Sequence, residues 1–139
     1  MKPRLHETRV EHEVPFHDVD MTHRVWHGHY YKYLELARTA LFRGHGLDDE
    51  KLIPGRYALY VVETRCRYTF PLRYRDRMRV SAWFRDVERR LAVAYEITNL
   101  SHGRRSARGL TTLAVVDDGG RMRMETPPEI VERIRANAG

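Results

Sequence analysis

Residues 30–46 read Tyr-Tyr-Lys-Tyr-Leu-Glu-Leu-Ala-Arg-Thr-Ala-Leu-Phe-Arg-Gly-His-Gly. Apolar side chains recur in this segment at intervals of three and four positions, and no proline interrupts it, which is the pattern of an amphipathic helix. Gly44 and Gly46 can adopt the left-handed backbone that ends a helix. We therefore predict one central helix from Tyr30 to Gly46, with an apolar stripe made of Tyr30, Tyr33, Leu34, Ala37, Ala40 and Leu41.

After this helix the sequence changes to the alternation of apolar and polar residues that is typical of strands. Four such runs follow, at residues 57–70, 78–85, 91–97 and 107–116. The connections between them are short, which favours antiparallel neighbours, because parallel strands need long crossovers. Thr126, Pro127 and Glu129 predict a second, short helix, in which Thr126 is the N-cap and Glu129 completes a capping box.

The order of elements defines the fold class. A strand through Val10 and Val14 and a polar loop precede the central helix, so the whole is an α+β layout with one helix against an antiparallel sheet. The 139 residues fit a single domain, which we assign to residues 1–139. A single helix covers only one face of the sheet and leaves strand edges and flat surface exposed. A second copy of the chain would cover them, so we expect a homodimer or a homotetramer.

Composition narrows the class of protein. Hydrophobic residues make up 42% of the chain and charged residues 32%, which suits a folded domain rather than a disordered one. No apolar run approaches the roughly 20 residues that cross a bilayer, and the first residues lack the apolar stretch of a signal peptide. We expect a cytoplasmic protein with no membrane contact. Cys66 is the one cysteine, which we expect to be a small core residue rather than a metal ligand.

The net charge of +6 comes mainly from arginine, since lysine occurs only at positions 2, 32 and 51. The guanidinium group binds phosphate through two parallel hydrogen bonds. An arginine-rich surface could therefore meet nucleic acid, a phosphorylated cofactor such as coenzyme A, or an acidic carrier protein, or it could be the solvated outer face of a sheet. Charge alone leaves these alternatives open.

The loop before the helix holds the densest group of ionisable side chains in the chain. Residues 17–30 read His-Asp-Val-Asp-Met-Thr-His-Arg-Val-Trp-His-Gly-His-Tyr. Loops that rigid elements hold in place often carry function. This loop is therefore the candidate functional segment.

Loop and helix together resemble the 4-hydroxybenzoyl-CoA thioesterase-like enzymes, whose signature runs D-x-D-x-x-G-x-V-x-H-x-x-Y, then an aromatic residue, then E-x-A-R. The matching positions are Asp18, Asp20, Val25, His27, Tyr30, Tyr33, Glu35, Ala37 and Arg38. The resemblance implies a hot-dog fold, in which an antiparallel sheet wraps around one helix. It also implies an acyl thioesterase that acts on acyl-CoA or acyl-carrier-protein thioesters and needs no cofactor or metal.

One position departs from that signature. His23 and Arg24 stand where the family has glycine and a small or apolar residue. The glycine lets the loop turn tightly. Histidine tolerates unusual backbone angles better than most residues, so we expect the loop to keep its course.

Hydrolysis of a thioester needs a nucleophile or a base that activates water, and donors directed at the developing oxyanion. The resemblance implies that Asp20 is the nucleophile or the general base, while Asp18 holds the loop. The His27 side chain could orient the substrate or protonate the leaving thiolate. Backbone N–H groups around His27 and Gly28, if they begin the helix, would supply the oxyanion donors.

Further residues are candidates for substrate binding. Tyr30 lies on the apolar stripe beside the loop. Glu35 could pair with a basic side chain one helical turn away, or it could reach the site as a second carboxylate. In the resembled family arginines often meet the phosphates of coenzyme A, and the candidates here are Arg89 and Arg90 in a predicted hairpin, with Arg104, Arg105 and Arg108 beyond it.

Rival functions remain open at the level of sequence. A metal-dependent hydrolase is disfavoured because the histidines and aspartates of the loop lack a known ligand spacing. Asp18 and His23 fit the short D-x-x-x-x-H pattern of hot-dog hydratases. A nucleic-acid module is disfavoured because the arginines show no aromatic stacking motif. A hot-dog protein that binds an acyl group without cleaving it is the remaining alternative.

Overall fold

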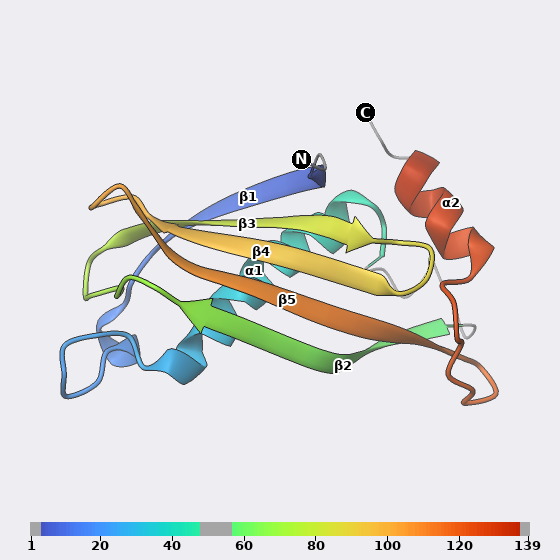
Figure 1. Ribbon diagram of the computed structural model, residues 1–139, viewed down its shortest axis with the longest axis horizontal. Coiled ribbons are helices and arrows are strands. Elements are labelled where there is room, and N and C mark those ends of the chain that lie inside the picture. The colour runs from blue at the N-terminus through green and yellow to red at the C-terminus, as the bar shows by residue number, and fades with distance from the viewer. Residues whose placement is uncertain (1–3, 48–56, 137–139) are drawn as a thin grey trace.

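A five-stranded antiparallel sheet forms the body of the computed structural model, which describes residues 4–47 and 57–136 (Figure 1). The strands lie in the order β1-β3-β4-β5-β2 and every neighbouring pair is antiparallel. Their bounds are β1 (Leu5–Glu13), β2 (Tyr57–Tyr68), β3 (Arg77–Asp86), β4 (Leu91–Asn99) and β5 (Arg104–Asp117). The α+β prediction is confirmed.

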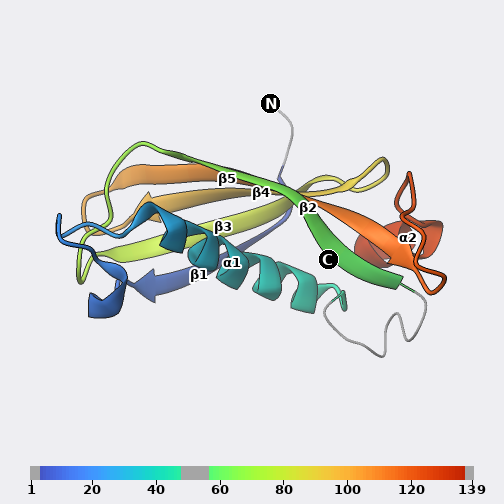
Figure 2. The same ribbon diagram turned by 90° about the horizontal axis from the view of Figure 1, so that it is seen from below.

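Helix α1 (Tyr30–Gly44) lies along one face of this sheet (Figure 2). Tyr33, Ala37 and Leu41 are fully buried, which confirms the predicted stripe there. The helix comes very close to β5 at Gly109, where an added Cβ would lie 2.8 Å from the Leu34 side chain. α1 ends two residues before the predicted position, and Gly46, with φ of 68°, then turns the chain away in the left-handed conformation.

Strands β2 and β3 are joined by a short connection but are not neighbours in the sheet, contrary to the expectation for short connections. Neighbours do follow one another in β3–β4 and β4–β5, but β2 pairs with β5 and β3 pairs with β1. α1 carries the chain across the sheet, so β2 starts at the edge opposite to β1 (Figure 1). Residues 69–76 then return the chain to the far side. The expectation was therefore wrong for this one connection.

Strand β2 is an exposed edge strand, and its alternation is broken by a bulge. Val61 pairs with Leu113 but Glu63 pairs with Thr112, so Val62 is an extra residue. Before the bulge the odd-numbered Leu59 packs against the core, and after it the even-numbered Cys66 does. The single apolar face predicted for residues 57–70 is therefore wrong at Tyr60, which is 57% exposed.

Helix α2 (Pro128–Ala136) lies at one end of the sheet and confirms the second predicted helix (Figure 1). Its predicted capping box is wrong. The Thr126 hydroxyl is buried without a hydrogen-bond partner among the described residues, and the Ile130 N–H donates instead to the carbonyl of Pro127 at 3.0 Å. Glu129 accepts a hydrogen bond from the Tyr57 hydroxyl at 3.0 Å, so its carboxylate joins α2 to β2 rather than capping the helix.

Two histidines meet where β1, α1 and α2 come together. The ring of His45, just after α1, is only 7% exposed, and its centroid lies 4.2 Å from that of His6. His6 Nε2 lies 3.1 Å from the Ile134 carbonyl of α2, whereas Nδ1 of His45 has no partner in the described part of the chain. Burial, and then the nearby His6, lower the pKa of His45 below its usual value.

This buried ring predicts a pH-dependent stability. The unfolded chain binds a proton at His45 near the ordinary pKa of about 6.5, before the folded chain does, so the free energy of unfolding should fall as pH drops below that value. We expect the melting temperature to fall between about pH 7.5 and about pH 5.5, and His45→Phe to reduce this fall. The half-buried His29 provides the control, His29→Phe, which should keep the wild-type fall. An equal fall in His45→Phe would contradict the prediction.

Candidate active site

The segment from Asp18 to Trp26 forms a short hairpin beyond the end of β1. Val19 and Val25 make an antiparallel bridge, and the Asp20 N–H donates to the Arg24 carbonyl at 2.9 Å. The Trp26 N–H donates to the Asp18 carbonyl at 3.1 Å. These hydrogen bonds hold the hairpin directly before α1, in the segment predicted to carry function.

Asp20 is exposed at the start of the hairpin turn. Its Oδ1 accepts hydrogen bonds from the backbone N–H of Thr22 at 2.8 Å and from the Thr22 hydroxyl at 2.5 Å. The Thr22 hydroxyl, and then the Thr22 backbone, hold the pKa of Asp20 below its usual range. The carboxylate is therefore ionised at neutral pH, and Thr22 engages only one of its two oxygens.

His23 takes the left-handed conformation at the position where the resembled family has glycine. Its φ is 65°, and its N–H donates to the Asp20 carbonyl at 3.0 Å, which closes the turn. Histidine occupies this conformation more readily than β-branched residues do. The turn at this position is thus made with histidine in place of glycine.

Asp18 is the buried anchor of the hairpin. It is 1% exposed, and it accepts hydrogen bonds from Lys32 Nζ at 2.6 Å and from the Tyr33 hydroxyl at 2.5 Å. His17 Nδ1 lies 3.0 Å from the same carboxylate. Burial alone would raise the pKa of Asp18, but the hydrogen bonds from Lys32 and Tyr33 outweigh it, so the pKa is lowered. Asp18 thus ties the hairpin to the first turn of α1.

A single turn of 3-10 helix, His27–His29, leads into α1. The backbone N–H groups of His27 and Gly28 donate to no acceptor within the described ranges. The indole of Trp26 lies directly against Gly28, where an added Cβ would come within 2.2 Å of a ring carbon. Only glycine fits beneath the ring in its present position.

Tyr68, the last residue of β2, completes the site and has no place in the sequence motif. Its hydroxyl donates to the carbonyl of His27 at 3.1 Å, and its ring packs edge-on against Tyr30 at 4.7 Å. Burial, first of all, raises the pKa of Tyr68, so the hydroxyl stays protonated at neutral pH. Tyr68 and His27 are 41 positions apart in the chain, and no local pattern predicts such a contact.

Some predicted substrate-binding residues lie outside this cluster. Glu35 is exposed on α1. Arg89 and Arg90 are exposed in the hairpin between β3 and β4. Glu13, just before the loop, pairs with Arg77 at the start of β3. A strand of this length spans about 30 Å, so the end of β3 lies about 30 Å from the loop, at the opposite end of the sheet. Within one chain, these arginines are not brought to Asp20.

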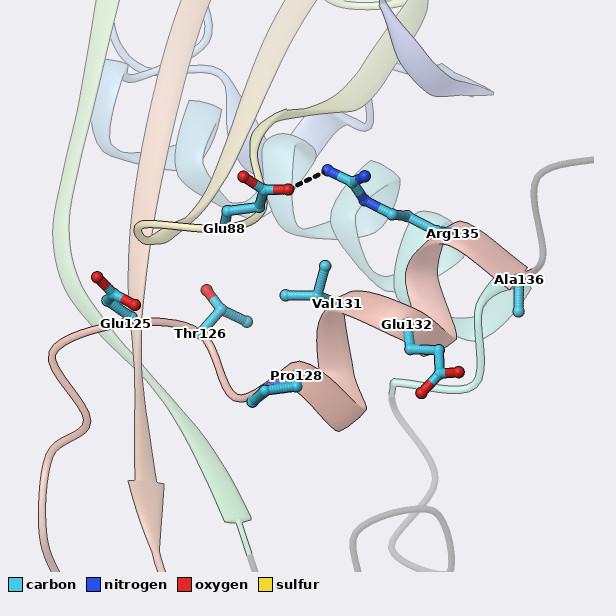
Figure 3. Close-up of a pocket in the computed structure, with 8 residues that line it drawn as sticks. All are labelled: Glu88, Glu125, Thr126, Pro128, Val131, Glu132, Arg135 and Ala136. Atoms are coloured by element: carbon cyan, nitrogen blue, oxygen red, sulfur yellow. Dashed lines mark hydrogen bonds and ion pairs between the residues drawn. The ribbon is translucent and has the colours of Figure 1, made fainter.

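A broad hollow lies elsewhere, beside α2 (Figure 3). It has a volume of about 730 Å³ and opens broadly to solvent between α2 and the β3–β4 hairpin. An ion pair between Glu88 and Arg135 spans it at 2.5 Å. None of the predicted catalytic residues lines it, so we place the candidate active site at the Asp20 hairpin.

Within residues 4–47 and 57–136, no group of three or more histidine, cysteine, aspartate or glutamate side chains is arranged to hold a metal ion. Among the same residues, no helix has the length and apolar character needed to cross a membrane.

An antiparallel sheet wrapped around one helix, with an aspartate hairpin at the helix start, defines a hot-dog domain of the thioesterase type. The chain belongs to the thioesterase-like superfamily, whose family model matches residues 14–134.

Relatives agree with this assignment. A Synechocystis protein named "Putative esterase sll0410" is 28% identical over 120 residues, covering 85% of this chain and 72% of its own length. The 1,4-dihydroxy-2-naphthoyl-CoA thioesterase Slr0204 from Synechocystis superposes with a TM-score of 0.78 at 20% identity, over 93% of this chain and 96% of that one. The DHNA-CoA thioesterase from Staphylococcus aureus has a TM-score of 0.75 at 21% identity, over 85% and 80% of the two chains. At identities of 20% and 21%, these two solved structures show that this chain shares their fold.

The buried carboxylate predicts a loss of stability in Asp18→Asn. The amide keeps the volume but removes the charged acceptor of Lys32 and Tyr33, so the free energy of unfolding in urea should fall by about 2 kcal/mol. Asp20→Asn is the matched control. Its side chain is exposed, and we expect the urea midpoint to stay at the wild-type value. Equal midpoints for the two variants would refute the anchoring role of Asp18.

Proposed function

We propose that this protein hydrolyses acyl thioesters of coenzyme A or of an acyl carrier protein to the free acid and the thiol. Membership of the thioesterase-like superfamily supports the reaction class. The observation that carries the proposal is the combination of an ionised, exposed carboxylate on the hairpin with two backbone N–H groups, just before α1, that have no acceptor among the described residues. These are the two groups that thioester hydrolysis requires.

In the proposed mechanism the thioester carbonyl oxygen accepts hydrogen bonds from the N–H groups of His27 and Gly28. Asp20, acting as general base, takes a proton from a water molecule while the water oxygen attacks the carbonyl carbon. The tetrahedral oxyanion is stabilised by the same two N–H groups and by the positive end of α1. Collapse expels the thiolate, which the His27 side chain protonates. The proton held by Asp20 then passes through solvent to His27, so both groups regain their starting forms. Direct attack by Asp20, followed by hydrolysis of the resulting anhydride, is the alternative route.

The acyl group would lie among the aromatic side chains around the turn. Trp26 lies against Gly28. The hydroxyl of Tyr68, whose ring packs against Tyr30, donates to the carbonyl of the neighbouring His27, so aromatic surface borders the turn. Such a surface suits an apolar or aromatic acyl group. The relatives named as thioesterases of aromatic acyl-CoA esters point in the same direction.

We further propose that β2 is where two chains meet. It is an edge strand whose outer side lacks a partner strand in the described part of the chain, and Tyr60, Val61 and Val62 are 57%, 48% and 44% exposed. An apolar edge strand of this length is a template for pairing with a second chain. Since Tyr68 belongs to the same strand, a partner there would lie beside the candidate site, which supports a homodimer or homotetramer as the working form.

Asp20→Asn tests the catalytic proposal. The substitution keeps the size of the side chain and removes the charge, so the turnover number for an acyl-CoA should fall by about 100-fold or more, equivalent to about 2.7 kcal/mol of barrier. Release of free thiol from a panel of acyl-CoA thioesters measures the effect. Wild-type activity should persist in EDTA. A variant that keeps more than half of the wild-type turnover would exclude Asp20 as the catalytic carboxylate.

Light scattering tests the proposed assembly. The wild-type protein should have a mass of at least two chains of 16.5 kDa at micromolar concentration. Two lysines on the edge strand, in Val61→Lys/Val62→Lys, should shift it to the monomer because buried like charges oppose pairing. Met124→Lys places a lysine at an exposed apolar residue away from β2 and should leave the mass unchanged. A monomeric wild-type protein would contradict the proposal.

A further inference from the structure

The face of the sheet turned away from α1 carries a second concave surface. It is a depression of about 600 Å³, a size typical of small-molecule sites, and its lining includes Arg4, Arg65, Arg67, Arg85, Arg105 and Arg108. We call this surface the outer arginine depression. Glu96 is the one carboxylate in its lining.

Strand geometry places these side chains on the face opposite the candidate active site. Arg108 lies between Ala107, which is fully buried in the core, and Gly109, which approaches Leu34 of α1. Successive side chains of a strand point to opposite faces, so Arg108 points away from α1. The same reasoning places Trp83 on the outer face, because Ala82 and Phe84 on either side of it are buried in the core.

Most of the positive charge in the outer arginine depression has no counterion among the described residues. Glu96 accepts contacts from Arg105 at 3.4 Å and Arg4 at 3.5 Å. The side chains of four other arginines form no ion pair with any residue in the described ranges, namely Arg65, Arg67, Arg85 and Arg108. The sheet therefore concentrates charge around a hollow instead of pairing it.

Two of these arginines directly oppose one another. Arg67 of β2 pairs with Arg108 of β5 in the strand register. Like charges at directly opposite positions destabilise a sheet, and an anion between them would relieve that cost. Arginine forks bind phosphate oxygens in pairs. On one side, the guanidinium of Arg4 stacks on the Trp83 ring at 3.9 Å, which adds a flat wall to the depression.

We propose that the outer arginine depression is a binding site for a small molecule that carries two or more linked phosphates, with Arg67 and Arg108 as its central ligands. The concave shape and the compact group of arginines suit an oligophosphate of nucleotide size better than an extended polymer. This chemistry has two possible sources. One is the phosphorylated head of the thioester substrate, an assignment that rests on the proposed function, and the other is a free nucleotide that binds independently of it.

Calorimetric titration with ADP and with inorganic tripolyphosphate at low ionic strength tests the site without using catalysis. The wild-type protein should bind both, and Arg67→Gln/Arg108→Gln should weaken binding by at least about tenfold. Arg73→Gln/Arg75→Gln removes the same charge at exposed positions before the start of β3, at the opposite end of that strand from Arg85, and should bind within about twofold of wild type. Arg65→Gln/Arg85→Gln replaces the first variant if that variant does not fold.

Three results would overturn the proposal: no binding of either probe by the wild-type protein, an equal loss in the two double variants, or tighter binding of a single-stranded oligonucleotide than of ADP. Hydrolysis assays then separate the two sources. A raised KM for acyl-CoA, with an unchanged KM for the N-acetylcysteamine thioester, would assign the site to the substrate head. Unchanged KM values for both thioesters, together with weakened ADP binding in calorimetry, would assign the site to a separate nucleotide. Absence of any hydrolysis would refute the proposed function and leave the binding result intact.

Discussion

The buried carboxylate of Asp18 is the constraint on which the candidate site depends. It is bonded to Lys32 and Tyr33 in the first turn of α1, while the Asp18 backbone carbonyl holds Trp26. A buried charge is tolerated only where opposite charge and hydrogen bonds compensate for its lost hydration. The two segments are therefore held in one relative position, because separating them would leave that carboxylate without its partners.

This anchor also explains the different roles of two neighbouring aspartates. Asp18 and Asp20 are separated by a single residue, yet one is buried and the other exposed. Asp18 ends the 3-10 turn Phe16–Asp18, and its carboxylate reaches Lys32 and Tyr33, whereas Asp20 begins the exposed hairpin turn. The hydrogen bonds of Asp18 are directed into the molecule. Asp20 remains at the surface, with its charge stabilised only by the turn that it begins. One carboxylate thus serves the structure and leaves the other free for chemistry.

The distribution of charge separates the two faces of the sheet. The inner face, which packs against α1, is apolar, whereas the outer face carries arginines that lack carboxylate partners among the described residues. The net charge of +6 is therefore partly a local feature, concentrated around one depression. The exposed apolar side chains of β2 form a separate surface at the sheet edge. The outer face thus suits anions, and the edge suits another chain.

The amino-acid sequence by itself determined the central helix, the strands and the α+β class, because these follow from spacing and from backbone preference within short segments. Tertiary structure decided the strand order, the bulge at Val62, the failure of the Thr126 cap, and the contacts of Tyr68 with His27 and Tyr30. Each of these depends on residues far apart in the chain. The opposed pair Arg67 and Arg108 is of the same kind, since each arginine is an ordinary strand residue until the register between β2 and β5 sets them face to face.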